Sequence, residues 1–189
     1  MEKACAEREK NYLASYDSIV SEMIREMTGV ETGCSISRDF ILQMIPHHQA
    51  AVSMSAELLK YSGLKPLRCI AENIITTQEN GICEMKAALD GCSCCKNSGQ
   101  EVCQYQRRFR DISRIMFAQM KCAPRDSGVN VDFIQEMIPH HRGAILMSEN
   151  ALQYPICPQL KPILDNIIRT QTQGIEKMQE ILRQQTECG

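Results

Sequence analysis

The sequence of 189 residues contains no tryptophan, and aromatic residues make up only 5% of it. Aromatic platforms on which nucleic-acid bases stack are therefore scarce. Excess positive charge is missing as well, because 21 Lys and Arg residues face 23 Asp and Glu residues, for a net charge of −2. Without a basic surface, binding to nucleic acid or to anionic lipid is not expected.

Long apolar runs are also lacking. The N-terminus reads MEKACAEREKNYLASYDSIV and has no apolar segment of the kind found in secretory signals, and no later run has the length of about 20 residues that spans a membrane. We therefore expect a cytoplasmic protein with no membrane partner, and export only if a leader has been removed. With 43% hydrophobic residues, the chain can still bury a core.

Strand signals are weak, because alternation is poor and β-branched runs are short. Apolar residues recur instead at spacings of three and four, which predicts an all-α fold of antiparallel helical bundles. Ser37 is the expected N-cap of the second helix. The predicted helices cover residues 8–28, 38–61, 66–89, 103–121, 130–153 and 159–185.

One helical unit occurs twice, at an offset of 93 residues. Residues 39–55 and 132–148 align without a gap and are identical at 11 of 17 positions, and residues 73–85 match 166–178 at 8 of 13. A repeat of this kind predicts two copies of one supersecondary unit that bury a common core.

The repeat divides the chain into two three-helix units, which we place at residues 1–91 and 104–189. Between them, residues 92–103 are rich in Gly, Ser, Asn and Cys and are interpreted as a linker. The two units are expected to pair with pseudo-twofold symmetry, because one three-helix unit alone leaves an apolar face uncovered.

The peptide FILQMIPHHQAAVSM and its counterpart FIQEMIPHHRGAILM carry the most unusual chemistry of the repeat. Pro46 removes a backbone donor and is expected to kink or restart the helix. On a helical wheel, Met44, His47 and Met54 lie on one apolar stripe, and His48 lies beside it. A stripe of this kind is usually ordinary core.

The repeat favours a chemical role for these side chains. All ten methionines after the initiator, and all four histidines, recur at the same offset, although core methionines usually interchange with Leu or Ile. The matched pairs are Met23 and Met116, Met27 and Met120, Met44 and Met137, Met54 and Met147, Met85 and Met178, His47 and His140, and His48 and His141.

Thioether and imidazole ligands together favour a soft monovalent metal, chiefly Cu(I) and by analogy Ag(I). Mg²⁺ and Ca²⁺ require oxygen ligands, and Zn²⁺ prefers thiolate and imidazole. We therefore predict Cu(I) binding for storage, buffering or tolerance, through these methionines and histidines in each unit. Whether the units share a site, and which histidine of each pair binds the metal, stay open.

The eleven cysteines do not follow the repeat, since only Cys95 and Cys188 match. In a chain without a secretory signal, reduced thiols are expected. Cys92, Cys94 and Cys95 form a second group of candidate ligands for Cu(I). The alternative is a flexible, reduced linker at the surface.

An enzymatic role is not expected. Glu136 precedes His140 by four residues, but its counterpart in the first unit is Gln43, so the carboxylate is not repeated. No phosphate-binding loop or His-Glu-x-x-His motif occurs. The competing hypothesis is a metal-free helical interaction or scaffold module, with methionine as adaptable packing. The sequence leaves the oligomeric state open.

The two Met-Ile-Pro-His-His motifs, each followed by Ala and Met and later by residues 78–85 or 171–178, resemble the domain of unknown function 305 family over nearly all of the chain. The resemblance implies a ferritin-like helical bundle in two tandem copies. It also implies a role in copper binding and tolerance, as for some members. The motif residues would be Met44, His47, His48 and Met54, with Met137, His140, His141 and Met147.

Overall fold

The computed structural model describes residues 2–125 and 127–187, and the side chains of residues 7–125 and 127–184; Cys188 lies outside them. Within these residues the fold has six α-helices and no strand, which confirms the all-α prediction. The helices are α1 (Glu2–Thr28), α2 (Ile36–Tyr61), α3 (Lys65–Ser93), α4 (Gly99–Lys121), α5 (Val129–Ala151) and α6 (Leu160–Glu187). None of these helices is long and apolar enough to cross a membrane.

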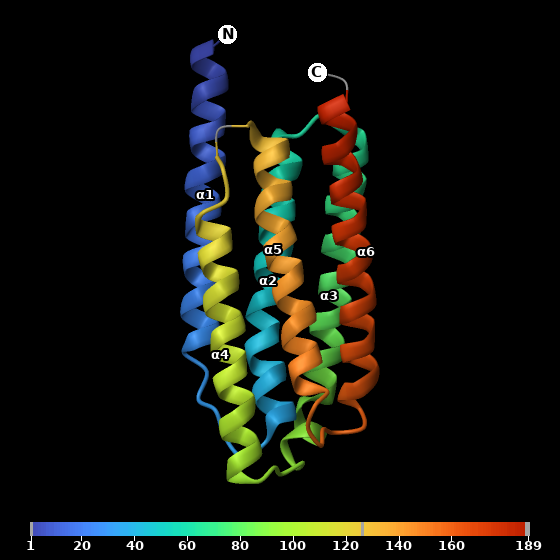
Figure 1. Cartoon of the computed structure of the whole chain (residues 1–189). Helices are drawn as coiled ribbons and strands as arrows, with labels where there is room; N and C mark the ends of the chain where they lie inside the picture. The colour runs from blue at the N-terminus through green and yellow to red at the C-terminus, as the bar shows by residue number, and fades with distance from the viewer. Residues whose placement is uncertain (1, 126, 188–189) are drawn as a thin grey trace.

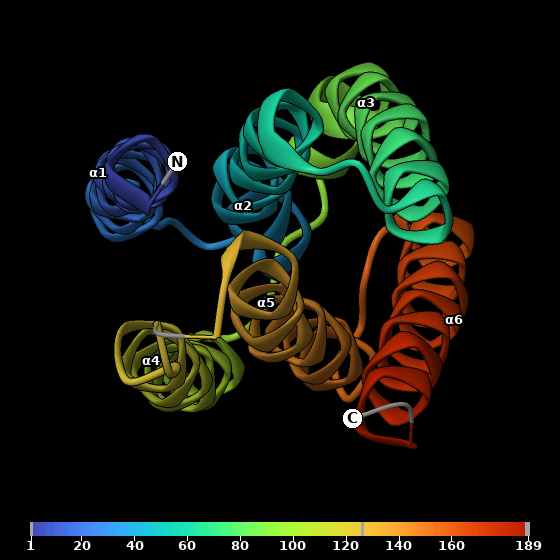
Figure 2. The ribbon, with the colours of Figure 1, turned by 90° about the horizontal axis from the view of Figure 1, so that it is seen from above.

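The helices run along one common axis, with both chain ends at the same end of the bundle (Figure 1). Within each unit the middle helix packs against the other two, so that α4, α5 and α6 repeat the order of α1, α2 and α3. The units meet through α2 against α5 and through α3 against α6. Seen from above, α2 and α5 therefore lie at the centre, with α3 and α6 on one side and α1 and α4 on the other (Figure 2).

Ser35 caps α2, so the prediction of Ser37 is wrong. The Ser35 hydroxyl accepts a hydrogen bond from the backbone N–H of Arg38 at 3.2 Å. Ser37 lies inside the helix, where its hydroxyl accepts a bond of 2.9 Å from the backbone N–H of Cys157. Both serines can cap a helix, and a long-range partner decides which of them does.

The linker is shorter than predicted and occupies residues 94–98 rather than 92–103. Ser98 and Glu101 form a capping box, in which each side chain accepts a hydrogen bond from the other residue's backbone N–H. This cap starts α4 at Gly99. The end of α3 and the start of α4 therefore lie within the segment that its composition indicated to be a linker.

The core is rich in methionine. All ten methionines after the initiator have side chains exposed by 2% or less. They pack with aliphatic and aromatic side chains into one continuous core that reaches all six helices. The central helices also bury all four histidines in this core, with 2% exposure or less.

Candidate functional site

The histidines of the two units meet at the centre of the bundle. The rings of His47 on α2 and His140 on α5 are stacked, with centroids 3.7 Å apart and planes inclined by 28°. The ring centroids of His47 and His48 are 6.1 Å apart, and those of His140 and His141 are 6.0 Å apart. The four imidazoles therefore form one group across the contact between the units, and we call them the histidine centre.

Burial keeps the histidine centre uncharged at neutral pH. It lowers the pKa of His140 to about 4 and that of His48 to about 3, the latter with a further contribution from His140. The pKa values of His47 and His141 also fall well below the usual value, again through burial first and then through the neighbouring imidazoles. Neutral imidazole is the form that binds metals.

Several ring nitrogens of the histidine centre lack a hydrogen-bond partner among the described residues: both nitrogens of His47 and Nδ1 of His48, His140 and His141. The His140 Nε2 atom donates to the carbonyl oxygen of His47 at 3.1 Å, which leaves Nδ1 of His140 unprotonated. The carbonyl of His140 lies near the His47 ring in a looser counterpart of this contact. Buried polar atoms are costly unless a protein group, an ordered water, an ion or a ligand satisfies them, so these nitrogens are candidate metal ligands.

Two glycines make room for the outer histidines. A Cβ atom at Gly81 on α3 would lie 3.1 Å from Cδ2 of His48, and one at Gly174 on α6 would lie 2.8 Å from Cδ2 of His141. These glycines match at the repeat offset, and this identity is the signal that could have revealed them. Each outer imidazole therefore packs against the bare backbone of the third helix in its own unit.

The methionines of the second and third helices lie on the elements that hold the histidine centre. Met85 follows Gly81 by four residues and Met178 follows Gly174 by four, so each lies one turn beyond a histidine contact. The four methionines of the repeated motif are exposed by 1% or less; they are Met44 and Met54 on α2, and Met137 and Met147 on α5.

The methionines of the first helices are buried as well. Met23 and Met27 on α1 are exposed by 1% and 2%. Met116 on α4 packs its sulfur against Gly143 on α5, where a Cβ atom would overlap Sδ. Gly143 therefore brings this thioether close to the backbone of a central helix.

Met120 lies in the last turn of α4, one turn after Met116, and is fully buried. Its carbonyl oxygen accepts a hydrogen bond of 3.5 Å from the hydroxyl of Tyr16 on α1. The bond joins the first helices of the two units rather than Met120 to the histidine centre. A role of Met120 as a metal ligand, like that of its counterpart Met27, therefore stays a prediction.

The repeated prolines do not break the helices, since α2 and α5 continue through Pro46 and Pro139. Of the two expectations for Pro46, a restart of the helix is excluded, and a kink stays a prediction. Both prolines are buried in the bundle.

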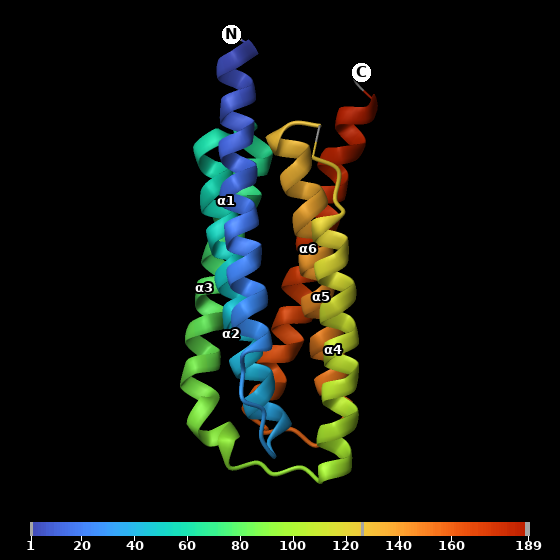
Figure 3. The same cartoon turned by 90° about the vertical axis from the view of Figure 1, so that its left-hand side faces the viewer.

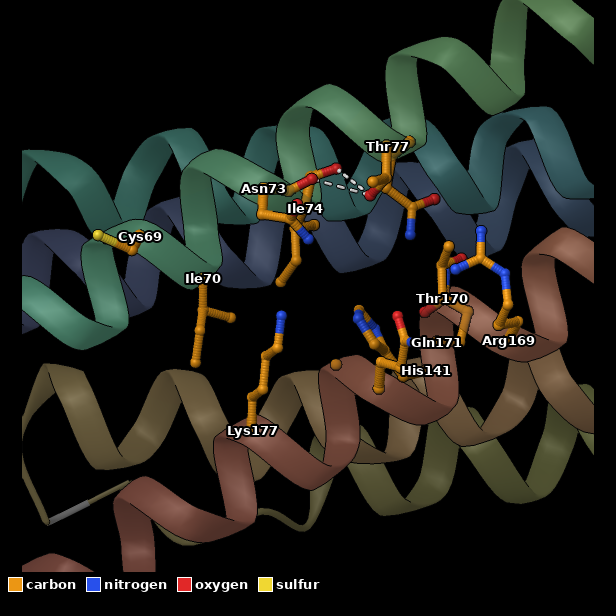
Figure 4. A pocket seen from close by; sticks show the side chains of 13 residues that line it. Cys69, Ile70, Asn73, Ile74, Thr77, His141, Arg169, Thr170, Gln171 and Lys177 are labelled. Atoms are coloured by element: carbon orange, nitrogen blue, oxygen red, sulfur yellow. Dashed lines mark hydrogen bonds between the residues drawn. The ribbon is translucent and has the colours of Figure 1, made fainter.

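A cavity of about 350 Å³ between α3 and α6 gives access to one end of the histidine centre. His141 reaches this cavity from α5, and Arg169 and Lys177 lie along its α6 side (Figure 4). Gln78 and Gln171, a matched pair, also line it, and their Oε1 atoms have no partner among the described residues. The cavity therefore has polar as well as apolar walls and carries positive charge.

The three candidate cysteines do not lie together. Cys92 is fully buried and Cys95 is half-buried, whereas Cys94 is exposed and its thiol points toward the carbonyl oxygen of Asp90 at 3.9 Å. Cys157, which the sequence analysis did not single out, is buried near Cys92 and Cys95.

No group of three or more His, Cys, Asp or Glu side chains in the described part of the chain is arranged to hold a metal ion. A site built from these four residue types alone is therefore not preformed. A metal at the histidine centre would need ligands of another kind, and the buried thioethers are the other donors present in this core.

The two units differ beside the histidine centre at Glu136, which replaces Gln43. The Tyr12 hydroxyl donates to Glu136 Oε2 at 3.2 Å, and the Arg125 guanidinium lies 3.7 Å from Oε1. Burial raises the pKa of Glu136 to about 8, against the opposing effects of Tyr12 and Arg125. Glu136 is therefore largely protonated at neutral pH.

Glu136→Gln is expected to stabilise the fold at alkaline pH. Because the pKa of Glu136 is raised in the folded state, its favourable contribution is complete below its ordinary value of 4.5 and is lost as pH rises through about 8. The glutamine variant should therefore nearly match the unaltered chain at pH 5 and exceed its unfolding free energy by roughly 5 kcal/mol at pH 9, since each pKa unit corresponds to about 1.4 kcal/mol. Urea unfolding at both pH values measures this difference.

The matched control is Gln43→Glu, which places a carboxyl at the equivalent position of the first unit. It should lower stability, and more so as pH rises. A Glu136→Gln variant with the same pH dependence of stability as the unaltered chain would show that Glu136 is ionised in the fold.

Comparison with known proteins places the fold and the repeat in context. A family model described as Domain of unknown function (DUF305) matches residues 9–89 and 110–187, one segment in each unit. No curated protein matches the chain.

Solved structures share the fold, and some of them hold a metal. CopM in an Ag-bound form obtained by soaking superposes with a TM-score of 0.58 at 28% identity, over 78% of this chain and 95% of that one. CopM in the Cu(II)-bound form superposes with a TM-score of 0.58 at 26% identity, over 78% of this chain and 96% of that one. A DUF305 fragment from Deinococcus radiodurans shares the fold, with a TM-score of 0.57 at 24% identity over 79% and 96%.

Proposed function

The chain belongs to the DUF305 family, and on this basis we propose that it binds Cu(I) through histidine and methionine for storage, buffering or tolerance. One observation carries the proposal: four neutral imidazoles with unpartnered nitrogens lie together in a core that also buries ten thioethers. Each buried nitrogen that stays unpaired costs free energy, and a bound metal ion would satisfy these nitrogens.

The donor set selects the metal. Thioether sulfur and neutral imidazole bind soft monovalent ions, and they match neither the oxygen preference of Mg²⁺ nor the thiolate preference of structural Zn²⁺. CopM structures hold silver in one form and Cu(II) in another. Their likeness to this chain supports copper, and the methionines of this chain favour the reduced ion.

The stacking of His47 on His140 joins the units in one shared histidine centre. We place the candidate ligands of both units around it, with the third-helix methionines, Met85 and Met178, beyond His48 and His141. Sharing accounts for the pairing of α2 with α5, because each unit contributes half of the central imidazoles.

Entry of the metal is proposed through the cavity between α3 and α6, where His141 is the accessible imidazole. Arg169 and Lys177 make this entrance positive, which disfavours a free cation and favours delivery of Cu(I) as an anionic thiol complex. A reducing cytosol would supply such complexes, and we propose that the chain acts there as a binding protein rather than an enzyme.

The test is an anaerobic titration of the reduced chain with Cu(I) in competition with a chromophoric chelator. We expect binding that competes with the chelator and that is lost when the four histidines and ten internal methionines are replaced. Binding that is unchanged in this variant would exclude the histidine and methionine ligands. Absence of copper binding in the unaltered chain would favour the metal-free interaction module.

Gly174→Ala is expected to weaken Cu(I) binding about tenfold, by analogy with changes that misplace metal-binding side chains. The new Cβ atom would lie 2.8 Å from Cδ2 and 2.9 Å from Nε2 of His141, so the imidazole must move. Alanine also favours the helix by about 1 kcal/mol, so weaker binding would not reflect a weaker helix. Competition titration measures the affinity.

The control is Gly99→Ala at the start of α4, where a Cβ atom would meet no atom within 4 Å. It should leave affinity unchanged. Equal affinities for both variants would show that His141 does not bind the metal.

A further inference from the structure

Three chain segments that are distant in sequence meet at the end of the bundle opposite the chain termini. They are the α1–α2 connection, the α3–α4 linker and the α5–α6 connection (Figure 1, Figure 3). Asn97 ties them together: its backbone N–H donates to Cys34 O at 2.8 Å, its Nδ2 donates to Pro155 O at 2.8 Å, and its Oδ1 accepts from Ile36 N at 3.0 Å.

Two further hydrogen bonds fix Cys92 and Cys157 to the start of α2. The Ser35 hydroxyl donates to the carbonyl oxygen of Cys92 at 2.9 Å, and the backbone N–H of Cys157 donates to the Ser37 hydroxyl at 2.9 Å. Cys92 is 0% exposed and Cys157 is 4% exposed. Two serines at the start of one helix thus hold both buried cysteines.

The thiols of Cys92, Cys95 and Cys157 interact directly, and we call them the thiol cluster. Cys157 contacts both of the others through its side chain. Burial and then the Cys157 thiol raise the pKa of Cys92 to about 12. The pKa of Cys157 is lowered, because hydrogen bonds from Cys92 and from backbone groups near the start of α6 outweigh the opposing effect of burial.

The thiol cluster does not derive from the repeat. The residue that matches Cys157 in the first unit is Leu64, and the residue that matches Cys92 in the second unit is Gln185. The histidine centre lies midway along α2 and α5, whereas the cluster lies at the bundle end. The sequence therefore builds the cluster independently of the histidine and methionine pairs.

We propose that Cys157 and Cys92 form a second soft-metal site, which takes Cu(I) in two-coordinate thiolate ligation, with Cys95 as the half-buried thiol through which the ion enters. Thiolate sulfur binds both Cu(I) and Zn²⁺, and a site with two ligands favours Cu(I), because structural Zn²⁺ takes four. Two ligands suffice for this ion, so the site does not require a preformed group of three. Cys94, adjacent in sequence but exposed, takes no part.

Binding is a ligand exchange without a change in oxidation state. Cu(I) leaves its chelator, forms bonds with the sulfurs of Cys157 and Cys92, and the thiol protons of these residues are released to solvent. Cys95 is half-buried and in contact with Cys157. It can therefore bind the incoming ion before the buried pair does.

The test is anaerobic Cu(I) titration of the fully reduced chain, followed by the near-ultraviolet charge-transfer band of copper thiolate. Cys157→Ser is expected to bind about one equivalent less and to lose most of this band, since a thiolate ligand is removed. Cys94→Ser is the matched control and should behave as the unaltered chain. Equal stoichiometry and band intensity in the two variants would overturn the proposal.

A second measurement needs no substitution at a buried position. Cys95→Ser should slow the appearance of the copper thiolate band at least about tenfold and leave its final intensity unchanged, because the ion enters through Cys95 but is held by Cys157 and Cys92. Cys94→Ser should change neither the rate nor the intensity. Equal rates in the two variants would contradict the site.

The two proposals fail separately. The His47→Phe, His140→Phe variant should keep the thiolate band, and Cys157→Ser should keep copper binding at the histidine centre. Copper that binds only when Cys157 is present would refute the proposed function and support the thiol cluster as a site. Copper that binds equally well without Cys157 would support the histidine centre and refute the thiol cluster.

Discussion

Replacement of both His47 and His140 by phenylalanine is expected to weaken Cu(I) binding at the histidine centre by roughly 100-fold or more, a loss at least as large as that from removing supporting residues of a metal site. The phenylalanine pair keeps two stacked rings in place of the imidazoles, whose centroids lie 3.7 Å apart, but removes every ring nitrogen. Packing is thus retained while the ligands are lost. Competition titration in a background that lacks Cys92 and Cys157 measures the change.

The same pair of substitutions provides its own folding control. Phenylalanine removes the unpaired buried nitrogens of His47 and His140, so the variant should be at least as stable as the unaltered chain in urea. A folded variant with undiminished affinity would show that the central histidines are packing residues. The metal-free interaction module would then be the better account of the motif.

Acidification is expected to destabilise the metal-free chain by several kcal/mol between pH 7 and pH 4.5. Burial depresses the pKa values of all four histidines below the ordinary value of 6.5. Below pH 6.5 the unfolded chain binds protons that the folded chain excludes, so stability falls as pH falls. For His140, with a folded pKa of about 4, the loss continues to that pH. Each pKa unit corresponds to about 1.4 kcal/mol.

Protonation of Glu136 stabilises the fold as pH falls, but the four histidines together have the larger, destabilising effect. The raised pKa of Glu136 adds stability as pH falls from about 8 to 4.5, through one proton against those of four histidines. Urea unfolding at a series of pH values should therefore show a net loss toward acid. In the His47→Phe, His140→Phe variant the loss should be much smaller. An equal loss in both chains would place the acid sensitivity elsewhere.

The order of the helices and the identity of the motif residues follow from the sequence, because a repeat exposes which side chains are kept in both copies. His47 and His140 were found in this way. Their stacking against each other was not, because it depends on the packing of α2 on α5, and such long-range contacts leave no local signal. The same holds for Met120, whose burial follows from the repeat but whose contact with Tyr16 does not.

Other errors have the same cause. Ser35 rather than Ser37 caps α2, because Ser37 is engaged by Cys157, 120 residues away. Cys157 was overlooked because it lacks a cysteine at the matching position and lies far from Cys92 in sequence. Gly81 and Gly174 could have been recognised, since matched glycines inside helices indicate a close neighbour.

The most direct test of the histidine and methionine site is X-ray absorption spectroscopy at the copper edge, on the chain loaded with Cu(I) in a background that lacks Cys92 and Cys157. The account predicts an edge characteristic of Cu(I) and a first coordination shell that contains imidazole nitrogen together with thioether sulfur. A shell of sulfur alone, or of nitrogen and oxygen without sulfur, would contradict it.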